Sequence, residues 1–384
     1  MSKMILPGQT IGIIGGGQLG RMMALAAKAQ GFRIAVLDPT EDSPCGQVAD
    51  IKVIAEYDDL LAIQQLSEVS DVITYEFENI DANALKWLCE NTYVPQGKEL
   101  LEITQNRVTE KAAIVKAGAE VAPYEVIELL EDLYPAVERI GYPCVLKTAT
   151  GGYDGKGQLV IKSEMDITKG EALVHSGLCV LEKWIPFEKE ISVIVVRNLR
   201  GETTVFPVGE NIHKENILHQ TIVPARINEQ AQTNAVDVAT QLAKSLNLVG
   251  TLAVEMFLTE EGQIYINELA PRPHNSGHYS IEACETSQFE QHIRAICNWP
   301  LGRTELLKPV VMVNILGEHQ KQVIQNIVEY PHWKIHLYGK KEATEKRKMG
   351  HVTILNNSIE DTILEINSCG IWGPVKERIG GLQC

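Results

Sequence analysis

The chain has 384 residues, of which 45% are apolar and 22% are charged, a composition typical of an ordinary globular protein with two or three domains. Its net charge of −15 argues against nucleic acid or an anionic membrane as a partner, because both attract basic surfaces. No apolar run reaches the roughly 18 residues of a membrane span, residues 1–7 do not resemble a signal peptide, and the scattered cysteines form no C-x-x-C pair, so we expect a cytoplasmic protein without a zinc site or a redox pair.

The N-terminal part has the pattern of a strand–helix–strand unit. Residues 10–14 and 33–37 are predicted to be buried strands, and residues 21–30 are predicted to form the helix between them. Residues 71–75 are predicted to be a later strand of the same sheet. This order predicts a parallel sheet with helices on its faces.

A glycine-rich turn, Gly15-x-Gly17-x-x-Gly20, connects the first strand to the helix, and Asp38 follows the second strand. This arrangement matches the fingerprint of a dinucleotide site, in which Asp38 would bind the ribose of NAD. The same turn can serve any phosphate or close backbone approach, and Asp38 precedes Pro39, as a turn residue often does. The motif alone therefore leaves the ligand open.

The pattern changes in the middle of the chain. Helices are predicted at residues 106–117 and 229–246. Antiparallel strands are predicted at residues 144–147, 158–161, 179–182, 190–197, 203–208, 251–257 and 263–267. Beyond residue 301, a short segment carries alternating strands and a basic cluster at residues 340–348. We therefore predict a central α+β domain followed by a small third domain.

One predicted strand ends in Lys147 and leads into a loop with glycines at positions 151, 152, 155 and 157. Glycine lets backbone N–H groups approach a phosphate closely, and Lys147 and Lys156 add positive charge. The loop therefore predicts a site for nucleotide phosphates under a mobile flap.

Two glutamates, Glu255 and Glu268, flank a hairpin that turns near Gly262. A two-residue loop would place Glu255 opposite Glu268 and a four-residue loop would place it opposite Ile266, so either even length puts both carboxylates on one face. Close carboxylates repel unless a cation lies between them, and oxygen ligands beside a phosphate favour Mg²⁺. The alternative is a pair of solvated acids, which the apolar neighbours disfavour.

A polar loop at residues 268–278 follows this hairpin. Arg272 can bind a planar oxyanion such as bicarbonate through two parallel hydrogen bonds, and His274 and Asn275 follow it closely. Glu182 and Glu190 can hold a nucleoside amine and ribose hydroxyls, although either glutamate alone is indistinguishable from a surface residue.

Taken in chain order, these motifs resemble the ATP-grasp superfamily. The segments that carry this resemblance are Lys147, the glycine-rich loop, Glu182-Lys183-Trp184-Ile185, Glu255 and Asn267-Glu268. Closer matches resemble the N5-carboxyaminoimidazole ribonucleotide synthetase family of purine biosynthesis, from about residue 10 to about residue 375. These matches are residues 16–21, 74–79, 151–158, 211–213, 268–278 and 347–351.

The resemblance implies three domains. They are a Rossmann-like parallel domain at residues 1–105, an antiparallel ATP-grasp domain at residues 106–300 with a mobile subdomain at about 120–185, and a small β-rich domain at residues 301–384. It also implies a homodimeric ligase in which ATP phosphorylates bicarbonate to carboxyphosphate. The carboxyl group then passes to the amine of aminoimidazole ribonucleotide.

The resemblance also implies residue roles. ATP would contact Arg107, Lys147, Gly152, Tyr153, Asp154, Gly155, Lys156, Gly157, Gln158, Glu182, Lys183, Trp184, Ile185, Glu190, His213, Asn267 and Glu268. The ribonucleotide would contact Gln18, Leu19, Glu76, Tyr153, Asp154, Lys341, Arg347 and Lys348. Mg²⁺ would bind Glu255 and Glu268. The reaction would depend on Asp154, Arg272, His274, Asn275 and Lys341, with Asp154 accepting or orienting the proton of the amine.

Other readings remain open at this point. A related ligase, such as a formate-dependent glycinamide ribonucleotide transformylase, would share the ATP site and differ in its acceptor. An NAD-dependent Rossmann enzyme would leave Lys147, Glu255 and Glu268 without roles, and a non-catalytic nucleotide-binding protein would be expected to lack one of them. Asn216 stands where the family usually has glycine, but asparagine tolerates positive φ, so the turn is expected to survive.

Overall fold

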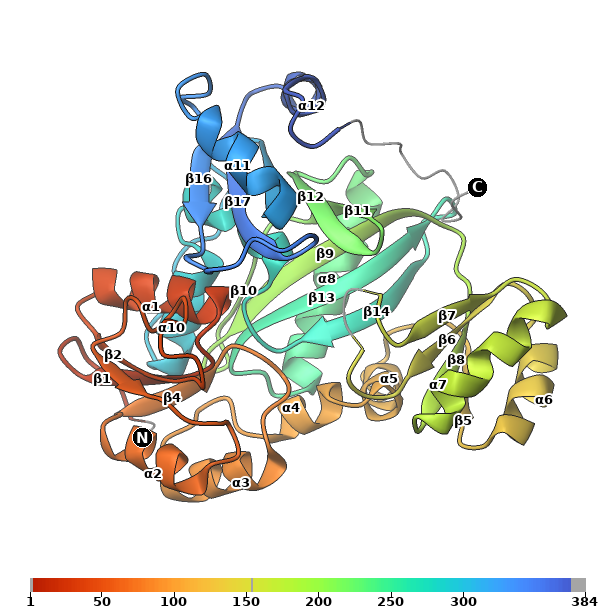
Figure 1. The fold of residues 1–384 in the computed structure, drawn as a ribbon, viewed down its shortest axis with the longest axis horizontal. Coiled ribbons are helices and arrows are strands. Elements are labelled where there is room, and N and C mark those ends of the chain that lie inside the picture. Colours follow the sequence, from red (N-terminus) through yellow and green to blue (C-terminus); the bar gives the residue numbers. More distant parts are fainter. Residues whose placement is uncertain (1–2, 153–154, 374–384) are drawn as a thin grey trace.

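The computed structural model describes residues 3–152 and 155–373, which form three β-sheets (Figure 1). The first is the predicted parallel sheet, in the order β3-β2-β1-β4. Its strands are β1 (Thr10–Ile14), β2 (Arg33–Leu37), β3 (Ile51–Val53) and β4 (Val72–Tyr75). Its helices are α1 (Gln18–Ala29), α2 (Leu60–Glu68) and α3 (Ala82–Asn91). Strand β1 is buried throughout, as expected for a strand covered on both faces.

Helix α1 begins earlier than its sequence indicated. It begins at Gln18 rather than at residue 21, so Gly20 lies in its first turn. The Glu76 carboxylate, just after β4, accepts hydrogen bonds from the backbone N–H groups of Gly17 and Gly20. The cap is therefore supplied by a residue far away in the sequence, which a local pattern does not reveal.

The second sheet is antiparallel, in the order β5-β8-β6-β7, and stands apart at the right of Figure 1. Its strands are β5 (Tyr124–Ile127), β6 (Cys144–Thr148), β7 (Gln158–Ile161) and β8 (Cys179–Lys183). Helices α6 (Leu130–Ile140) and α7 (Glu171–His175) pack against it. Two helices, α4 (Glu99–Thr104) and α5 (Arg107–Lys116), connect it to the parallel sheet.

The third sheet has nine antiparallel strands, in the order β14-β13-β9-β11-β12-β15-β17-β16, with β10 beside β9. These strands are β9 (Phe187–Arg197), β10 (Thr203–Val205), β11 (Gly209–Lys214), β12 (Ile217–Val223), β13 (Gly250–Thr259), β14 (Ile264–Ala270), β15 (Val310–Leu316), β16 (Lys334–Leu337) and β17 (Lys348–Leu355). The helices of this region are α8 (Glu229–Ser245), α9 (Ser280–Ala283), α10 (Gln288–Ile296), α11 (Gly317–Gln325) and α12 (Ile359–Ser368).

The segment beyond residue 301 continues the large sheet. Strand β15 pairs with β12, so the β-structure crosses the predicted domain boundary without a break. The hairpin of β11 and β12 had no counterpart among the predicted strands, and β10 ends at Val205 rather than at residue 208. In the turn between β11 and β12, Asn216 has a φ of 64°, which confirms the expected positive φ.

Within residues 3–152 and 155–373, no helix has the length and apolar character to cross a bilayer. The cysteines of these ranges are free thiols, and five of them are buried, namely residues 45, 144, 179, 284 and 297.

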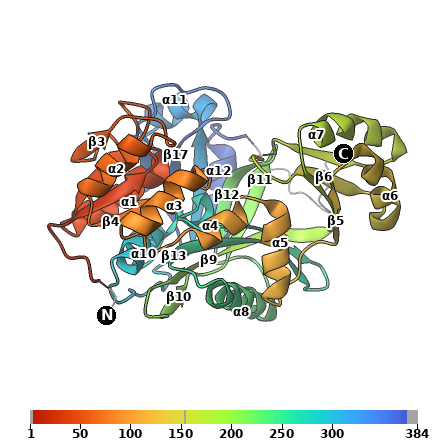
Figure 2. The same cartoon turned by 90° about the horizontal axis from the view of Figure 1, so that it is seen from below.

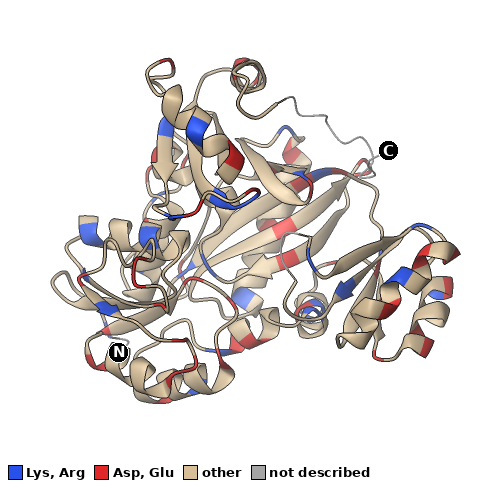
Figure 3. Ribbon diagram, in the orientation of Figure 1, with Lys and Arg blue, Asp and Glu red and all other residues tan. Residues whose placement is uncertain are grey.

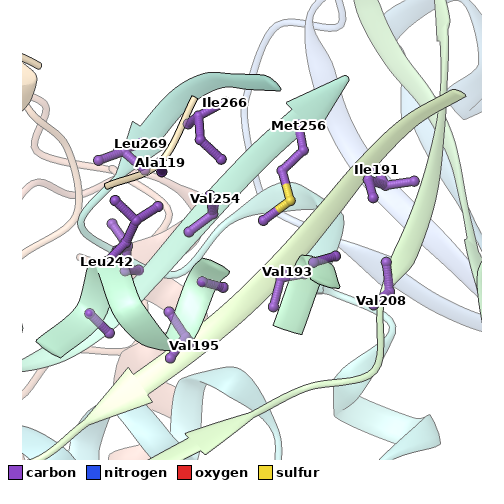
Figure 4. Close-up of a cluster of buried hydrophobic side chains, with 14 of the residues drawn as sticks. Ala119, Ile191, Val193, Val195, Val208, Leu242, Val254, Met256, Ile266 and Leu269 are labelled. Carbon is purple, nitrogen blue, oxygen red and sulfur yellow. The ribbon is translucent and has the colours of Figure 1, made fainter. Parts of the chain in front are cut away.

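The alternation of side chains along β9 and β13 divides the large sheet into two faces. Ile191, Val193 and Val195 of β9 point to the same side as Val254 and Met256 of β13 (Figure 4). This side packs on α8, which lies under the sheet in Figure 2. The intervening residues, including Glu190 and Glu255, therefore face the opposite side.

Leu242 of α8 tests this core. It is fully buried against β9 and β13. Leu242→Ala should lower the free energy of unfolding by about 2–5 kcal/mol, because it removes buried methyl groups and leaves a cavity. Urea denaturation followed by circular dichroism measures the loss. The matched change Leu364→Ala, at a residue with 65% exposure, should have little effect, and an equal loss in both variants would contradict this packing.

Candidate active site

A cleft of about 720 Å³ lies where the three sheets meet. Figure 2 shows the parallel sheet and the small sheet on opposite sides of the large one. Glu190, His213, Glu255 and Glu268 of the large sheet line the cleft between them. Twenty-two of the predicted site residues line the cleft. They are Gln18, Leu19, Glu76, Arg107, Lys147, Gly152, Gly155, Lys156, Gln158, Glu182, Lys183, Trp184, Ile185, Glu190, His213, Glu255, Asn267, Glu268, Arg272, His274, Asn275 and Lys348.

Glu255 and Glu268 lie directly opposite each other on β13 and β14. The connecting loop differs from both predicted lengths, because Thr259 and Gln263 pair around the three residues 260–262. An odd loop would turn Glu268 to the other face, but a β-bulge at Asn267 shifts the register by one residue between Glu255 and Met256. The bulge therefore brings the two carboxylates onto the cleft face.

The carboxylate pair has the electrostatics of a cation site. Burial and the neighbouring charge of Glu268 raise the pKa of Glu255. His274 Nε2 lies 3.3 Å from Glu255 Oε1, and Arg107 Nη1 lies 3.6 Å from Glu268 Oε2. No group of three or more His, Cys, Asp or Glu side chains within residues 3–152 and 155–373 is arranged to hold a metal by itself. Figure 3 shows acidic segments on the strands at the centre of the molecule.

The small sheet contributes a buried charge network. Lys147 Nζ lies 2.9 Å from Glu182 Oε2, and Lys111 Nζ lies 3.1 Å from Glu182 Oε1. Burial opposes the ionisation of Glu182, but the two lysines outweigh it and lower its pKa to about 2. Lys147 lines the cleft, whereas Lys111 is only 1% exposed and does not.

The large sheet adds a second ion pair. His213 Nδ1 on β11 lies 2.5 Å from Glu190 Oε2 on β9. Burial disfavours the protonated imidazole, but the charge and hydrogen bond of Glu190 prevail and raise the pKa of His213. The two residues come together because β9 and β11 are neighbouring strands, with Glu190 paired with Asn211.

The polar loop after β14 forms the end of the cleft. Arg272 Nε lies 2.8 Å from Glu78 Oε1, an acid that follows β4. Arg272 Nη1 also donates to the Pro273 carbonyl oxygen at 3.2 Å. Burial lowers the pKa of His274 well below its usual value, and the nearby Arg272 adds to the effect, so the imidazole is neutral.

The glycine-rich turn of the parallel sheet is closed by carboxylates of the chain itself. Asp38 Oδ2 accepts hydrogen bonds from Gly16 N at 2.7 Å and from the Tyr57 hydroxyl at 2.6 Å. The Glu76 carboxylate accepts hydrogen bonds from Gly17 N and Gly20 N. A Cβ at position 16 would lie 2.6 Å from Asp38 Oδ2. In this structure the backbone N–H groups of Gly16, Gly17 and Gly20, which a phosphate could otherwise engage, are therefore already hydrogen-bonded to carboxylates of the chain.

Some predicted site residues lie elsewhere. Tyr153 and Asp154 lie outside the described residues. Gly157 does not line the cleft. Lys341 is 71% exposed and lies 3.4 Å from Asp42, and Arg347 donates from Nη1 to the Glu342 carbonyl at 3.0 Å. Neither of these basic side chains lines the cleft, although Lys348 does.

Other residues of the site were not expected from sequence. Glu110 of α5 accepts a hydrogen bond from Leu269 N at 2.8 Å, and burial together with Glu268 raises its pKa to about 8. With Arg107 and Lys111 it occupies one face of α5, at the spacing of a helical stripe. This spacing could have indicated a buried charged face from the sequence, but a stripe of charged residues on a helix is normally interpreted as facing solvent.

Asn216 also lies closer to the site than expected. It lines the cleft, and a Cβ at Gly155 would lie 2.7 Å from Asn216 Nδ2. The side chain at this departure from the family pattern therefore bears on the glycine-rich loop and affects more than the local turn.

Comparisons with known proteins agree with this architecture. A ribonucleotide synthetase preATP-grasp domain matches residues 8–105, and an ATP-grasp domain matches residues 112–289. A phosphoribosylaminoimidazole carboxylase C-terminal domain matches residues 310–364. The three matches follow one another along the chain and correspond to the parallel sheet, the small sheet with most of the large sheet, and the last strands.

Individual relatives cover nearly the whole chain. The N5-carboxyaminoimidazole ribonucleotide synthase of Bacillus subtilis (strain 168) is 57% identical over 369 residues, 96% of this chain and 97% of its own. A solved ADP complex of an N5-carboxyaminoimidazole ribonucleotide synthetase superposes with a TM-score of 0.95 at 63% identity, covering 97% of this chain and 99% of that one. The Aspergillus clavatus enzyme in complex with ADP and 5-aminoimidazole ribonucleotide has a TM-score of 0.89 at 30% identity, with 94% and 97% covered. The chain belongs to the N5-carboxyaminoimidazole ribonucleotide synthase family of ATP-grasp ligases.

Proposed function

We propose that this protein uses ATP and bicarbonate to carboxylate the amine of 5-aminoimidazole ribonucleotide, releasing ADP and phosphate. The observation that carries the proposal is the cleft itself. It joins a paired carboxylate site, a lysine-bearing small sheet and a polar loop with a guanidinium. Relatives solved with ADP and with 5-aminoimidazole ribonucleotide support these two ligands.

The ATP end of the cleft lies between the small and large sheets. Lys147 and Arg107 would neutralise the phosphates, while the β8 segment that begins at Glu182 would meet the adenine and Glu190 the ribose. Glu255 and Glu268 would hold Mg²⁺, and their mutual repulsion makes the pair suited to a cation. When bound, that ion supplies charge neutralisation for the transferred phosphoryl group.

The polar loop would hold bicarbonate beside the terminal phosphate. A bicarbonate oxygen attacks the terminal phosphorus of ATP, the bond to ADP breaks, and carboxyphosphate forms. The amine nitrogen of the ribonucleotide then attacks the carboxyl carbon, and phosphate leaves with the electrons of the broken C–O bond. Arg272 and Asn275 would orient the oxyanion, and the neutral His274 can donate or accept a hydrogen bond there.

The acceptor would lie between Gln18, Leu19 and Glu76 on one side and Lys348 on the other. Asp154 would accept or orient the amine proton, with Tyr153 beside it. Lys341 and Arg347 would reach the 5′-phosphate from the segment before β17. We also propose that the protein is cytoplasmic and that it is a homodimer, and size-exclusion chromatography with light scattering tests the dimer.

The proposed reaction predicts a strict requirement for both substrates. ADP release should occur with bicarbonate and 5-aminoimidazole ribonucleotide together and should fall to background when the ribonucleotide or the bicarbonate is left out. A coupled assay for ADP in carbonate-depleted buffer measures this. Equal ADP release with formate and glycinamide ribonucleotide would instead indicate the transformylase, and reduction of NAD would indicate a dehydrogenase.

Glu255 tests the metal assignment. Glu255→Ala should lower turnover by at least about a hundredfold, because one of the two proposed Mg²⁺ ligands is lost. Glu261→Ala removes an exposed acid from the loop of the same hairpin and should leave turnover unchanged. Turnover at increasing Mg²⁺ concentration distinguishes weak metal binding from a general defect. Full activity of Glu255→Ala would remove the assignment.

Lys147 and Lys111 both pair with Glu182, but only Lys147 lines the cleft, so the two lysines can distinguish a role in ligand binding from a structural role. Lys147→Met should weaken ADP binding about tenfold or more, because a charged hydrogen bond contributes roughly 1.5–3 kcal/mol. Lys111→Met removes the other partner of Glu182 but not a cleft-lining group, so ADP affinity should stay near that of the parent protein. Isothermal titration calorimetry measures both affinities. Equal losses in the two variants would contradict a direct role for Lys147.

A further inference from the structure

Asn275, at the end of the cleft, forms a reciprocal amide pair with a residue from another part of the chain. Asn275 Nδ2 donates to Asn314 Oδ1 at 3.0 Å, and Asn314 Nδ2 donates to Asn275 Oδ1 at 2.6 Å. Asn314 lies on β15 and is 1% exposed, so it does not itself line the cleft. The pair joins the polar loop to the C-terminal part of the large sheet.

A backbone carbonyl fixes which way both amides face. Asn314 Nδ2 also donates to the Leu218 carbonyl oxygen of β12 at 2.7 Å. A carbonyl oxygen can only accept, so the NH₂ group of Asn314 must point toward Leu218, and its Oδ1 must accept from Asn275. The orientation of the Asn275 amide follows from this, since its Oδ1 meets the remaining hydrogen of Asn314.

This orientation determines what Asn275 presents to a ligand. One hydrogen of its NH₂ group is bound to Asn314, and no acceptor for the second is found within residues 3–152 and 155–373. Asn275 lines the cleft beside His274 and Arg272. A fixed N–H donor next to a guanidinium suits an oxyanion better than a cation or an apolar group.

The neighbouring residues of the polar loop have comparable supports from other elements. Glu78, after β4, holds Arg272. Gln288, at the start of α10, accepts from His274 N at 2.9 Å and donates to the His274 carbonyl at 2.7 Å. Arg272, His274 and Asn275 are therefore held from the parallel sheet, from α10 and from β15 in turn, and Asn314 is the support that the C-terminal part supplies.

We propose that Asn314 is a positioning residue for the bicarbonate-derived group, acting through Asn275 without touching the ligand. This inference rests on the proposed function. It gives the C-terminal part of the large sheet a role in the first half-reaction, in addition to any contact that its basic residues make with the ribonucleotide. Without Asn314, the Asn275 amide is free to turn its oxygen toward the oxyanion.

The test compares Michaelis constants for the substrates. Asn314→Ala and the nearly isosteric Asn314→Asp both remove the donors to Leu218 and Asn275. Each should raise KM for bicarbonate about tenfold, as expected for one misdirected hydrogen bond, and leave KM for ATP and the affinity for ADP unchanged. ADP titration confirms that each variant is folded. If Asn314→Ala disrupts the sheet, the Asn314→Asp variant is used for the comparison.

Asn198→Ala is the matched control. Asn198 is also fully buried, and its amide donates to Glu202 Oε2 at 2.8 Å and to the Trp299 carbonyl at 3.2 Å, away from the cleft. It should lower thermal stability without changing KM for bicarbonate. An unchanged KM in folded Asn314 variants, or an equal rise in Asn198→Ala, would overturn the inference alone. A parent enzyme whose ADP release ignores bicarbonate would overturn the proposed function and the inference together.

Discussion

The close approach of two carboxylates, Glu255 and Glu268, is the constraint on which the rest of the site depends. Their charges repel across the β13–β14 pair, and water screens Glu255 only in part, because its side chain is 17% exposed. The fold holds them together with a bulge at Asn267 and compensates with nearby cationic or polar groups, Arg107 and His274. A bound cation would relieve this repulsion, and this is the physical basis of the proposed Mg²⁺ site.

Other charged side chains around the cleft are also paired, and each partner comes from a different helix or strand. Glu182 is shared by Lys111 of α5 and Lys147 of β6, and Glu190 pairs with His213 across two strands. Removing one partner of such a pair leaves an uncompensated buried charge, so these contacts hold α5 against the small sheet and hold neighbouring strands within each sheet. A site made of groups from three sheets can surround a nucleotide and a second substrate together.

Local patterns in the sequence were sufficient for much of the fold. Strands β1 and β2 follow the predicted bounds, because continuous apolar runs between turn residues are strong local signals. The β11–β12 hairpin was not predicted, and its turn is made by Glu215 and Asn216 at positive φ rather than by glycine. The glycine fingerprint matched that of a dinucleotide site and left the ligand open. In the structure Asp38 and Glu76 accept hydrogen bonds from its amides, and no local pattern specifies these contacts.

The sequence by itself determined which chemical groups the protein carries and their order along the chain. These are Lys147 with the glycine-rich loop, the paired glutamates and the Arg272–Asn275 loop. Motif spacing is encoded locally, so it can be read directly. Tertiary structure decided how these groups meet. The bulge that turns Glu268 to the cleft, the burial of Glu110 and Lys111, and the amide pair of Asn275 with Asn314 all depend on residues far apart in the chain. Such contacts arise only when the sheets pack, because burial and orientation are properties of the assembled fold.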